Sequence, residues 1–245
     1  MRPGGGRQIE VTIEAIGARG DGYGTHAGQP VFVPFTLPGD RVLARLSGRH
    51  AGGLRAEAIE LLEEGPHRIA PPCPHFGTCG GCTVQHLAEA PYVDWKRSLL
   101  VRALAQRGLA EIAVAPLRRV AAGTRRRVVL AAAKAGKRLR LGLHQRASHT
   151  VVDLETCLVL SPGLMALLPP LRRALAEVLA DGETADVALT ETAAGADVLI
   201  LCDAALTLAG REALAGLAQS ADLARLSWGA MPRAGDDGSP DPIAI

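Results

Sequence analysis

The chain has 245 residues, of which 48% are hydrophobic, 21% are charged and only 3% are aromatic, and its formal net charge is +2. This composition is that of an ordinary globular protein and excludes collagen-like, disulfide-rich and largely disordered chains. The sequence shows neither a secretory leader nor an apolar run of about 18 residues, so we expect a cytoplasmic protein that does not bind membranes.

The small net charge hides an uneven distribution along the chain. Residues 96–146 hold 14 basic side chains and one acidic one, whereas residues 147–245 hold 5 basic and 14 acidic ones. Guanidinium groups pair with phosphate oxygens, and dense positive charge is typical of a nucleic-acid surface. A solvated surface without a ligand is the alternative interpretation, and the single acid in the block leaves the two about equally supported.

Residues 1–65 are predicted to form a small β-barrel. Hydrophobic and polar side chains alternate in 8–16, and further strands are expected in 30–35 and 40–48. The stretch 54–64 fits either a strand or a helix. The glycine-rich segment 17–28 ("GARGDGYGTHAG") is expected to be a turn or a flexible loop rather than a phosphate-binding loop, because no helix follows it. Four or five short strands separated by glycine and proline turns are typical of an OB-like barrel.

A helix is expected in 91–108, after a cysteine-containing loop in 66–90. Pro91 suits the first helical turn, Gly108 suits the C-cap, and Tyr92, Trp95 and Leu99 begin an apolar stripe at helical spacing.

Residues 124–235 are predicted to form an α+β domain with a mostly antiparallel sheet. Strand patterns occupy 125–133, 138–145, 149–154, 185–191, 196–203 and 223–229, and helical patterns occupy 161–182 and 207–220. Ser161 is the predicted N-cap of the first of these helices. Strand pairs with interspersed helices indicate one sheet layer covered by helices. Residues 236–245 are expected to be a loop-like tail.

Three of the five cysteines lie in the stretch "CPHFGTCGGCTVQH", which runs from Cys73 to His86. Cys79 and Cys82 are separated by two glycines, which allow both sulfur atoms to face one point. A redox C-x-x-C pair would leave Cys73 unexplained, so clustered thiols in a reducing compartment favour a metal site.

The spacing of the cysteines leaves the identity of the metal open. A zinc ion would take His75, His86 or Cys157 as the fourth ligand, whereas an iron–sulfur cluster prefers four thiolates and would take Cys157. The remaining cysteine, Cys202, lies in the apolar run "VLILCDA" and is predicted to be a small core residue.

The pattern C-x5-C-G-G-C-x-x-Q-H resembles that of the RNA 5-methyluridine methyltransferases; its members here are Cys73, Cys79, Gly80, Gly81, Cys82, Gln85 and His86, with Cys157 following. The stretch "GDGYGTHAGQPVFVPFTLPGDRV" is similar to the N-terminal TRAM domain of that family. The resemblance covers essentially the whole chain. It implies S-adenosylmethionine-dependent methylation of uridine C5 in ribosomal or transfer RNA, and a [4Fe–4S] cluster on Cys73, Cys79, Cys82 and Cys157.

The family resemblance also implies a catalytic thiolate, a base and a cofactor site in a C-terminal Rossmann-like domain, which the sequence after Trp228 does not show. We therefore predict no catalytic and no S-adenosylmethionine-binding residue in this chain. We expect a truncated or divided enzyme that is inactive alone, whose residues 91–123 pack on the missing domain. A separate polypeptide would then supply that domain. The alternative is a stand-alone RNA-binding protein with a cluster or a zinc site.

The RNA contacts are predicted from the basic block and the barrel. On two adjacent strands they are Arg125, Arg126, Arg127, Lys134, Lys137, Arg138 and Arg140. Strict alternation would send Arg125 and Arg127 to one face and Arg126 to the other. In the barrel, the loop around Tyr23 is predicted to supply an aromatic ring for base stacking.

Overall fold

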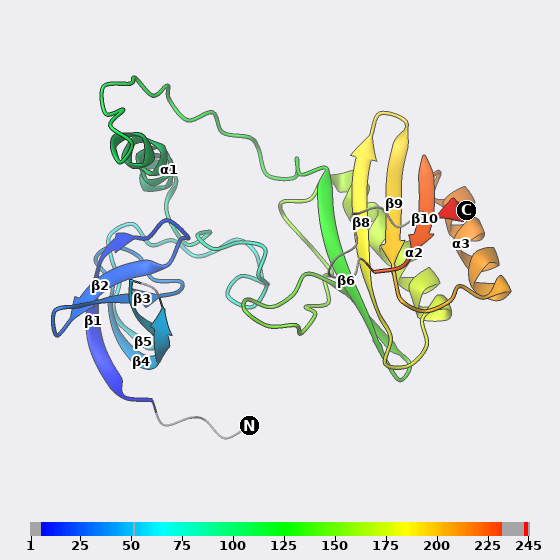
Figure 1. Ribbon diagram of the computed structural model, residues 1–245, viewed down its shortest axis with the longest axis horizontal. Helices are drawn as coiled ribbons and strands as arrows, with labels where there is room; N and C mark the ends of the chain where they lie inside the picture. Colours follow the sequence, from blue (N-terminus) through cyan, green and yellow to red (C-terminus); the bar gives the residue numbers. More distant parts are fainter. Residues whose placement is uncertain (1–5, 51, 232–242, 245) are drawn as a thin grey trace. The chain divides into compact units, whose positions relative to one another are not determined.

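The computed structural model describes residues 6–50, 52–231 and 243–244, and the chain divides into two compact units (Figure 1). Unit 1 consists of residues 1–77 and 82–119, and unit 2 consists of residues 78–81 and 120–245. Unit 1 contains a closed β-barrel, and unit 2 contains a six-stranded sheet with helices. The predicted α+β class is therefore confirmed.

The barrel of unit 1 is built from β1 (Gln8–Ile16), β2 (Gly22–His26), β3 (Gln29–Val33), β4 (Arg41–His50) and β5 (Gly53–Glu63). The strand order is β1-β2-β3-β5-β4, and β4 pairs with β1 to close the ring. Only the β3–β5 pair is parallel among these pairings. The barrel is filled by alternating strand residues: Ile9, Val11, Ile13, Val31, Val33, Val42, Ala44 and Ala56. The hydrophobic alternation read from the sequence thus produces the barrel core.

Strand β2 lies inside the segment that the sequence predicts to be a loop. Its glycines point into the barrel, where there is no room for a side chain. A Cβ atom on Gly22 would lie 2.0 Å from Oγ1 of Thr36, and one on Gly24 would lie 2.3 Å from the carbonyl oxygen of Thr12. The glycines are needed for the close approach of neighbouring backbones and not for a turn. The prediction of a loop throughout 17–28 was therefore wrong.

Helix α1 (Glu89–Ala105) follows the cysteine loop and packs within unit 1. Trp95 is buried in a cluster with Ile16, Leu37 and Leu87, and Tyr92 and Leu99 pack against that cluster. Leu100 and Val101, on the other side of the helix, remain 52% and 36% exposed. The predicted apolar stripe is thus covered at Trp95 by the barrel unit itself. Packing of the exposed side on a further domain stays a prediction.

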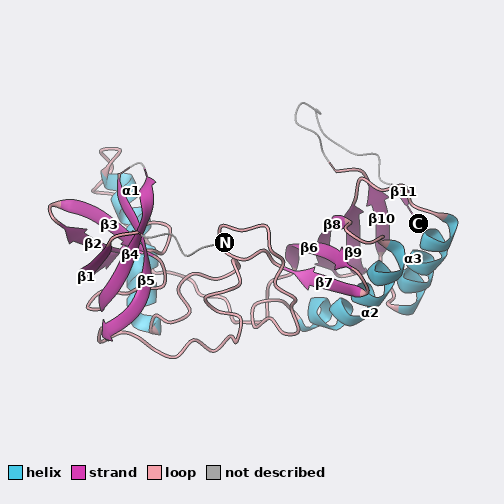
Figure 2. Ribbon diagram, turned by 90° about the horizontal axis from the view of Figure 1, so that it is seen from below, coloured by secondary structure: helices cyan, strands magenta, loops and turns pink. Residues whose placement is uncertain are grey.

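Unit 2 is a sheet with helices on one face (Figure 2). Its elements are β6 (Arg127–Ala135), β7 (Arg138–Gly142), α2 (Pro162–Val178), β8 (Thr184–Thr192), β9 (Gly195–Leu201), α3 (Leu208–Ser220), β10 (Arg225–Gly229) and β11 (Ile243–Ala244). The strand order is β11-β10-β9-β8-β6-β7, with β9–β10 as the parallel pair. As predicted, Ser161 caps α2, because its side chain accepts a hydrogen bond from the Leu164 amide at 3.4 Å.

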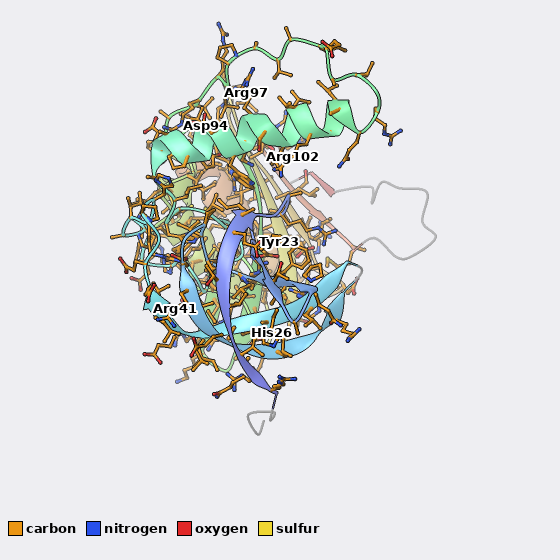
Figure 3. The ribbon with its side chains drawn as sticks, turned by 90° about the vertical axis from the view of Figure 1, so that its left-hand side faces the viewer. Tyr23, His26, Arg41, Asp94, Arg97 and Arg102 are labelled. Carbon is orange, nitrogen blue, oxygen red and sulfur yellow. The ribbon has the colours of Figure 1, made fainter. Side chains whose placement is uncertain are left out.

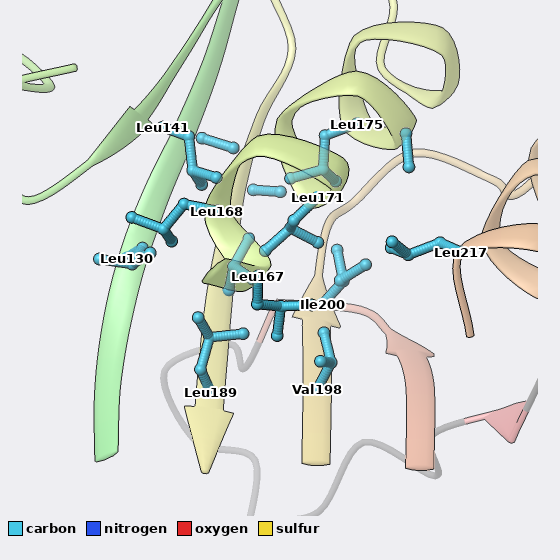
Figure 4. Close-up of a cluster of buried hydrophobic side chains, with 14 of the residues drawn as sticks. Leu130, Leu141, Leu167, Leu168, Leu171, Leu175, Leu189, Val198, Ile200 and Leu217 are labelled. Atoms are coloured by element: carbon cyan, nitrogen blue, oxygen red, sulfur yellow. The ribbon is translucent and has the colours of Figure 1, made fainter. Parts of the chain in front are cut away.

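The core of unit 2 lies between the sheet and these helices (Figure 4). Leu164, Leu168, Leu171 and Leu175 of α2 are each at most 1% exposed. They follow the helical period and face alternate residues of the strands, such as Leu130, Leu189 and Ile200 (Figure 4). This face of the sheet is therefore fully covered, and functional side chains of unit 2 must project from its edges, its loops or the opposite face.

The segment 149–154 is not a regular strand, but it pairs antiparallel with residues 141–145 through a bridge between His144 and Val151 and backbone hydrogen bonds from Val152 to Leu143 at 2.8 Å and from Leu154 to Leu141 at 3.0 Å. The side chain of Asp153 accepts from the Leu141 amide at 3.2 Å and so takes the place of a backbone partner. The predicted loop-like tail falls largely outside the described residues, which include only β11 of that stretch. In the part of the chain that the structure describes, no helix has the length and apolar character needed to cross a membrane.

Candidate functional site

Residues 78–81, which hold the first part of the C-x-x-C loop, are fixed in unit 2 by backbone contacts. Cys79 forms a β-bridge with Gln145, and the Gly80 amide donates to the carbonyl of His144 at 2.9 Å. The Gly81 amide donates to Sγ of Cys79 at 3.4 Å. A Cβ atom on Gly81 would lie 2.7 Å from a methyl group of Leu143. Gly81 therefore allows close packing beside the sulfur, and the N–H···S bond favours a thiolate ligand at Cys79.

The two remaining cysteines of unit 2 lie in different environments. Cys157 is half-buried and, like Cys79, packs against the edge of the unit 2 core. Cys202 is only 3% exposed within that core, so its predicted role as a core residue is confirmed. Burial raises the pKa of the Cys202 thiol, which keeps it protonated and unreactive.

Cys73 and Cys82 belong to unit 1, where the rest of the cysteine-containing segment is held on the barrel. Backbone hydrogen bonds of 2.9 Å join Ile69 to His86 and Ala88 to His67. The ring of Phe76 lies 5.2 Å from that of Phe35 and 5.0 Å from that of His86, measured between centroids. Both cysteines are half-buried. Aromatic packing thus fixes this part of the loop independently of any metal.

His86 is a buried polar residue of this packing. It is 1% exposed, and no hydrogen bond of ordinary geometry reaches either ring nitrogen in the described structure. Burial, together with the nearby charge of Arg68, lowers the pKa of His86 from 6.5 to about 4, while Asp40 and the Phe35 carbonyl oppose the shift. The ring is therefore neutral at pH 7 and acts as a packing element.

The four predicted ligand cysteines are divided between the units, with Cys73 and Cys82 in unit 1 and Cys79 and Cys157 in unit 2. Among the residues that the structure describes, no group of three or more His, Cys, Asp or Glu side chains is close enough to hold a metal ion. The chemistry of the donors nevertheless fits a cluster, because four half-buried thiols are the ligands that iron–sulfur clusters require. The predicted metal site is therefore supported by donor type and not by geometry.

The predicted arginines come together at the start of β6. Arg125, Arg126 and Arg127 are exposed and line a pocket of ≈ 450 Å³ together with Thr190, Glu191 and Thr192 of β8. Strand β6 begins only at Arg127, so the alternation predicted for the triplet does not extend to its first two residues. Three guanidinium groups against one carboxylate make this pocket electropositive, and hydroxyl groups add hydrogen-bond donors.

The carboxylate of Glu191 lies beside the start of α2. A Cβ atom on Gly163, in the first turn of that helix, would lie 2.1 Å from Oε1 of Glu191. A carboxylate at this position is stabilised by the positive end of the helix dipole. The local sequence gives no signal for Glu191, Thr190 and Thr192, because β8 and β6 are brought together only by the sheet.

The other predicted basic residues are not equivalent. Lys134 donates to the carbonyls of Ala176 and Leu179 at 2.6 and 2.5 Å, so its ammonium group caps the end of α2. Arg138 lies 3.8 Å from Asp153. Lys137 and Arg140 are exposed, and Arg140 is opposite Ala133 in the β6–β7 pair. Lys134 is therefore occupied by a structural role, whereas the others remain exposed to a ligand.

Tyr23 lies in β2 and not in a loop, on the side of unit 1 that Figure 3 presents. Its ring centroid is 5.6 Å from that of Phe32 in β3, and the two rings are tilted by 56°. The closed barrel with this aromatic pair on its wall occupies residues 8–63.

Residues 5–59 match the TRAM domain family. This match coincides with strands β1 to β5, apart from the last residues of β5, so the barrel of unit 1 is the TRAM barrel. It confirms the TRAM prediction made from the stretch that begins at Gly20.

The chain is also similar to longer proteins. A Caulobacter vibrioides protein named as an RNA methyltransferase is 42% identical over 193 residues, which are 77% of this chain and 45% of that protein. A 23S rRNA (uracil(1939)-C(5))-methyltransferase from Pectobacterium atrosepticum is 35% identical over 195 residues, or 77% of this chain and 43% of that protein. A Brucella suis protein named as an RNA methyltransferase is 40% identical over 219 residues, which are 89% of this chain and 51% of that protein. The chain thus spans about half the length of the relatives it matches.

A solved structure shares the fold of nearly the whole chain and not only that of the TRAM barrel. The Pyrococcus abyssi tRNA (uracil-54, C5)-methyltransferase, solved in complex with S-adenosyl-L-homocysteine, has a TM-score of 0.66 over 96% of this chain and 54% of its own. At 21% sequence identity, this likeness concerns the fold of the chain.

Proposed function

We propose that this chain is the RNA-binding and [4Fe–4S]-carrying portion of an S-adenosylmethionine-dependent methyltransferase that modifies uridine C5 in 23S rRNA or tRNA. The observation that carries the proposal is the TRAM match on a closed barrel in a chain whose relatives are named RNA methyltransferases, uracil-C5 enzymes among them. Both the barrel and the arginine pocket of unit 2 offer RNA-binding surfaces.

The RNA-binding role of unit 2 rests on Arg125, Arg126 and Arg127. Their guanidinium groups are exposed at one pocket, and in the described part of the chain none of the three forms an ion pair. Guanidinium groups bind phosphate oxygens bidentately, and the hydroxyl groups of Thr190 and Thr192 beside them can also donate hydrogen bonds to phosphate oxygens. Arg138, Arg140 and Lys137 extend the positive surface along β7.

The proposed cluster would be held by the thiolates of Cys73, Cys79, Cys82 and Cys157. When bound, it supplies four iron–sulfur bonds that connect the thiolates through one inorganic core. Two of these cysteines belong to each unit. The Gly81 amide, which already donates to Cys79, would stabilise its thiolate.

Methyl transfer requires a site for S-adenosylmethionine, a nucleophile and a base. We propose this chemistry for the cytoplasmic enzyme that contains this chain, and not for residues 1–245 alone.

RNA binding is tested by the salt dependence of affinity. A uridine-containing single-stranded RNA oligonucleotide is titrated with the chain at several salt concentrations. Charge reversal at Arg125, Arg127 and Arg138 should weaken binding and lower the salt slope by about 0.7 for each phosphate that the protein no longer binds. Arg211→Glu is the matched control, because Arg211 is exposed on α3 of the same unit. Unchanged affinity in the triple variant would refute the arginine site.

The metal proposal is tested on anaerobically purified protein. Iron and acid-labile sulfide in equal amounts, with the broad visible absorbance of a cluster, would support it. Stoichiometric zinc without iron or sulfide would show that the cluster assignment is wrong and favour the zinc-site alternative.

A further inference from the structure

Three side chains form one row across three strands of the TRAM barrel. Tyr23 of β2 lies directly opposite Phe32 of β3 in the antiparallel pair. Phe32 in turn lies opposite Arg55 of β5 in the parallel pair. Directly opposed residues in a sheet project from the same face. The three side chains, which we call the barrel row, therefore stand side by side on the barrel wall.

The barrel row faces outward. The residues that alternate with Phe32, Val31 and Val33, are 0% exposed and belong to the barrel core, and the neighbours of Tyr23 in β2 are the buried glycines. Tyr23, Phe32 and Arg55 are each half-buried. Two aromatic rings and a guanidinium group on the outer wall of a barrel are not required by the core, which is complete without them.

The two ends of the barrel row are bordered by small residues. Beyond Tyr23, the opposed residue on β1 is Ala15, and beyond Arg55 the opposed residue on β4 is Gly48. Glu57, the next outward residue of β5, is opposite Arg45 and not beside Gly48. Arg55 is therefore flanked across the sheet by a glycine and an aromatic ring, and the residues directly opposite the two ends of the row, Ala15 and Gly48, are small.

The geometry of the aromatic pair leaves ring surface open to a flat ligand. With centroids 5.6 Å apart and planes tilted by 56°, Tyr23 and Phe32 do not stack face to face. An unpaired nucleobase can stack on an aromatic ring whatever its sequence, and an arginine beside it can stack on the next base or bind a phosphate. An extended single strand that crosses three barrel strands would meet the two rings and the guanidinium in turn.

We infer that the barrel row Tyr23–Phe32–Arg55 is a stacking platform for unpaired bases of single-stranded RNA. This inference rests on the proposed RNA-binding function and assigns part of it to Phe32 and Arg55, two residues outside the RNA contacts predicted from the sequence. The arginine pocket of unit 2 binds phosphates, whereas the barrel row binds bases.

Cross-strand aromatic pairs also stabilise sheets. If Tyr23 and Phe32 had only this structural role, replacing one ring would lower stability and leave RNA affinity unchanged. Phe32→Leu retains an apolar side chain on the wall and removes only the flat ring, so the fold should persist. Because Phe32 stacks on a base and binds no phosphate, its replacement should leave the salt slope unchanged while lowering affinity at every salt concentration.

The experiment measures the affinity of the full chain for an unstructured oligouridine by fluorescence anisotropy. Phe32→Leu and Tyr23→Leu should each bind at least about five-fold more weakly than the parent, since stacking of one base is lost. Ile59→Ala, which removes a 42% exposed apolar side chain of β5 outside the row, is the matched control and should bind like the parent. Thermal unfolding of all variants shows that each is folded at the assay temperature.

The outcomes separate the inference from the function on which it rests. If the parent chain binds no RNA, the proposed function fails. If the parent binds and the triple arginine variant weakens binding, but Phe32→Leu and Tyr23→Leu bind as tightly as Ile59→Ala, the platform is refuted while the RNA-binding function stands. A ring-dependent loss for a peptide ligand but not for oligouridine would likewise overturn the assignment to RNA.

Discussion

Arg68 donates its Nε–H to Oδ1 of Asp40 at 3.2 Å, and the Asp40 side chain is completely buried beneath it. Asp40 also accepts from the amides of Leu37 at 2.7 Å and Gly65 at 2.8 Å. Arg68 follows the last barrel strand and donates to the Phe35 carbonyl as well. One carboxylate thus joins the end of the TRAM barrel to the segment that leads into the cysteine loop.

Asp40→Asn should destabilise unit 1 by about 3–5 kcal/mol, because it leaves the Arg68 charge without its buried partner. Burial by itself raises the pKa of Asp40, but hydrogen bonds from Arg68, Gly65 and Leu37 lower it below the ordinary value of 3.8. The stabilisation is therefore full above that value and is lost as the pH falls through the folded-state pKa. Urea denaturation at pH 7 measures the change.

Glu10→Gln is the control for this variant, because the Glu10–Arg41 ion pair at 2.9 Å is exposed. Its loss should change the free energy of unfolding far less than Asp40→Asn does, because solvent screens an exposed pair. Equal effects of the two substitutions would contradict the assigned importance of the buried pair.

Acid should destabilise unit 1 through His86 before it affects Asp40. Since the folded-state pKa is lowered from 6.5 to about 4, the unfolded chain binds the proton more readily. Stability is therefore full above pH 6.5 and falls as the pH decreases toward about 4. His86→Phe, which keeps an aromatic ring beside Phe76, should remove this part of the pH dependence, whereas the exposed His149→Phe should not. Unfolding free energies measured across this range decide between the two.

The cysteines should separate into ligand and core residues. Cys157→Ala is expected to abolish iron and sulfide incorporation and to destabilise the chain, because one of four cluster ligands is lost. Cys202→Ala should retain iron, since that thiol is buried in the core of unit 2. Metal analysis of both purified variants provides the measurement; iron loss in Cys202→Ala alone would reverse the assignment.

Lys134 should affect stability and not RNA affinity. Its ammonium group donates to two carbonyls at the end of α2, an interaction worth about 1–2 kcal/mol at a partly buried helix terminus. Lys134→Met should lower the stability of unit 2 by that amount and leave the RNA salt slope unchanged. Lys137→Met, at the exposed β6–β7 turn, should leave the stability of unit 2 unchanged and lower the RNA salt slope, because Lys137 belongs to the proposed phosphate-binding surface.

Two glycines should respond oppositely to alanine. Gly22→Ala places a Cβ atom 2.0 Å from Thr36 Oγ1 inside the barrel and should destabilise unit 1 by several kcal/mol. Gly216→Ala, in the exposed middle of α3 with no heavy atom within 4 Å of the added Cβ, should stabilise unit 2 by about 0.5–1 kcal/mol. Thermal denaturation distinguishes them; a tolerated Gly22→Ala would show that the barrel interior has unexpected room.

Most regular elements could be predicted because their own side chains specify them. The alternation of Ile9, Val11 and Ile13 gives β1, and Ser161 with the leucines of α2 gives the start and the buried face of that helix. The segment 149–154 pairs less regularly than its alternation predicts. Backbone hydrogen bonds join Leu154 to Leu141 and Val152 to Leu143, but the Leu141 amide donates to the Asp153 side chain, which no periodicity reports.

The sequence by itself determined the kinds of group that are available: a cluster of cysteines, a block of arginines and the strand pattern of a TRAM barrel. These depend on residue type and local spacing. Only the tertiary structure decided which of them act together. It made Gly22–His26 a strand because backbones approach closely there, and it turned Lys134 toward α2. It also set Phe32 between Tyr23 and Arg55, since cross-strand neighbours are fixed by register, a relation between distant segments that no local pattern contains.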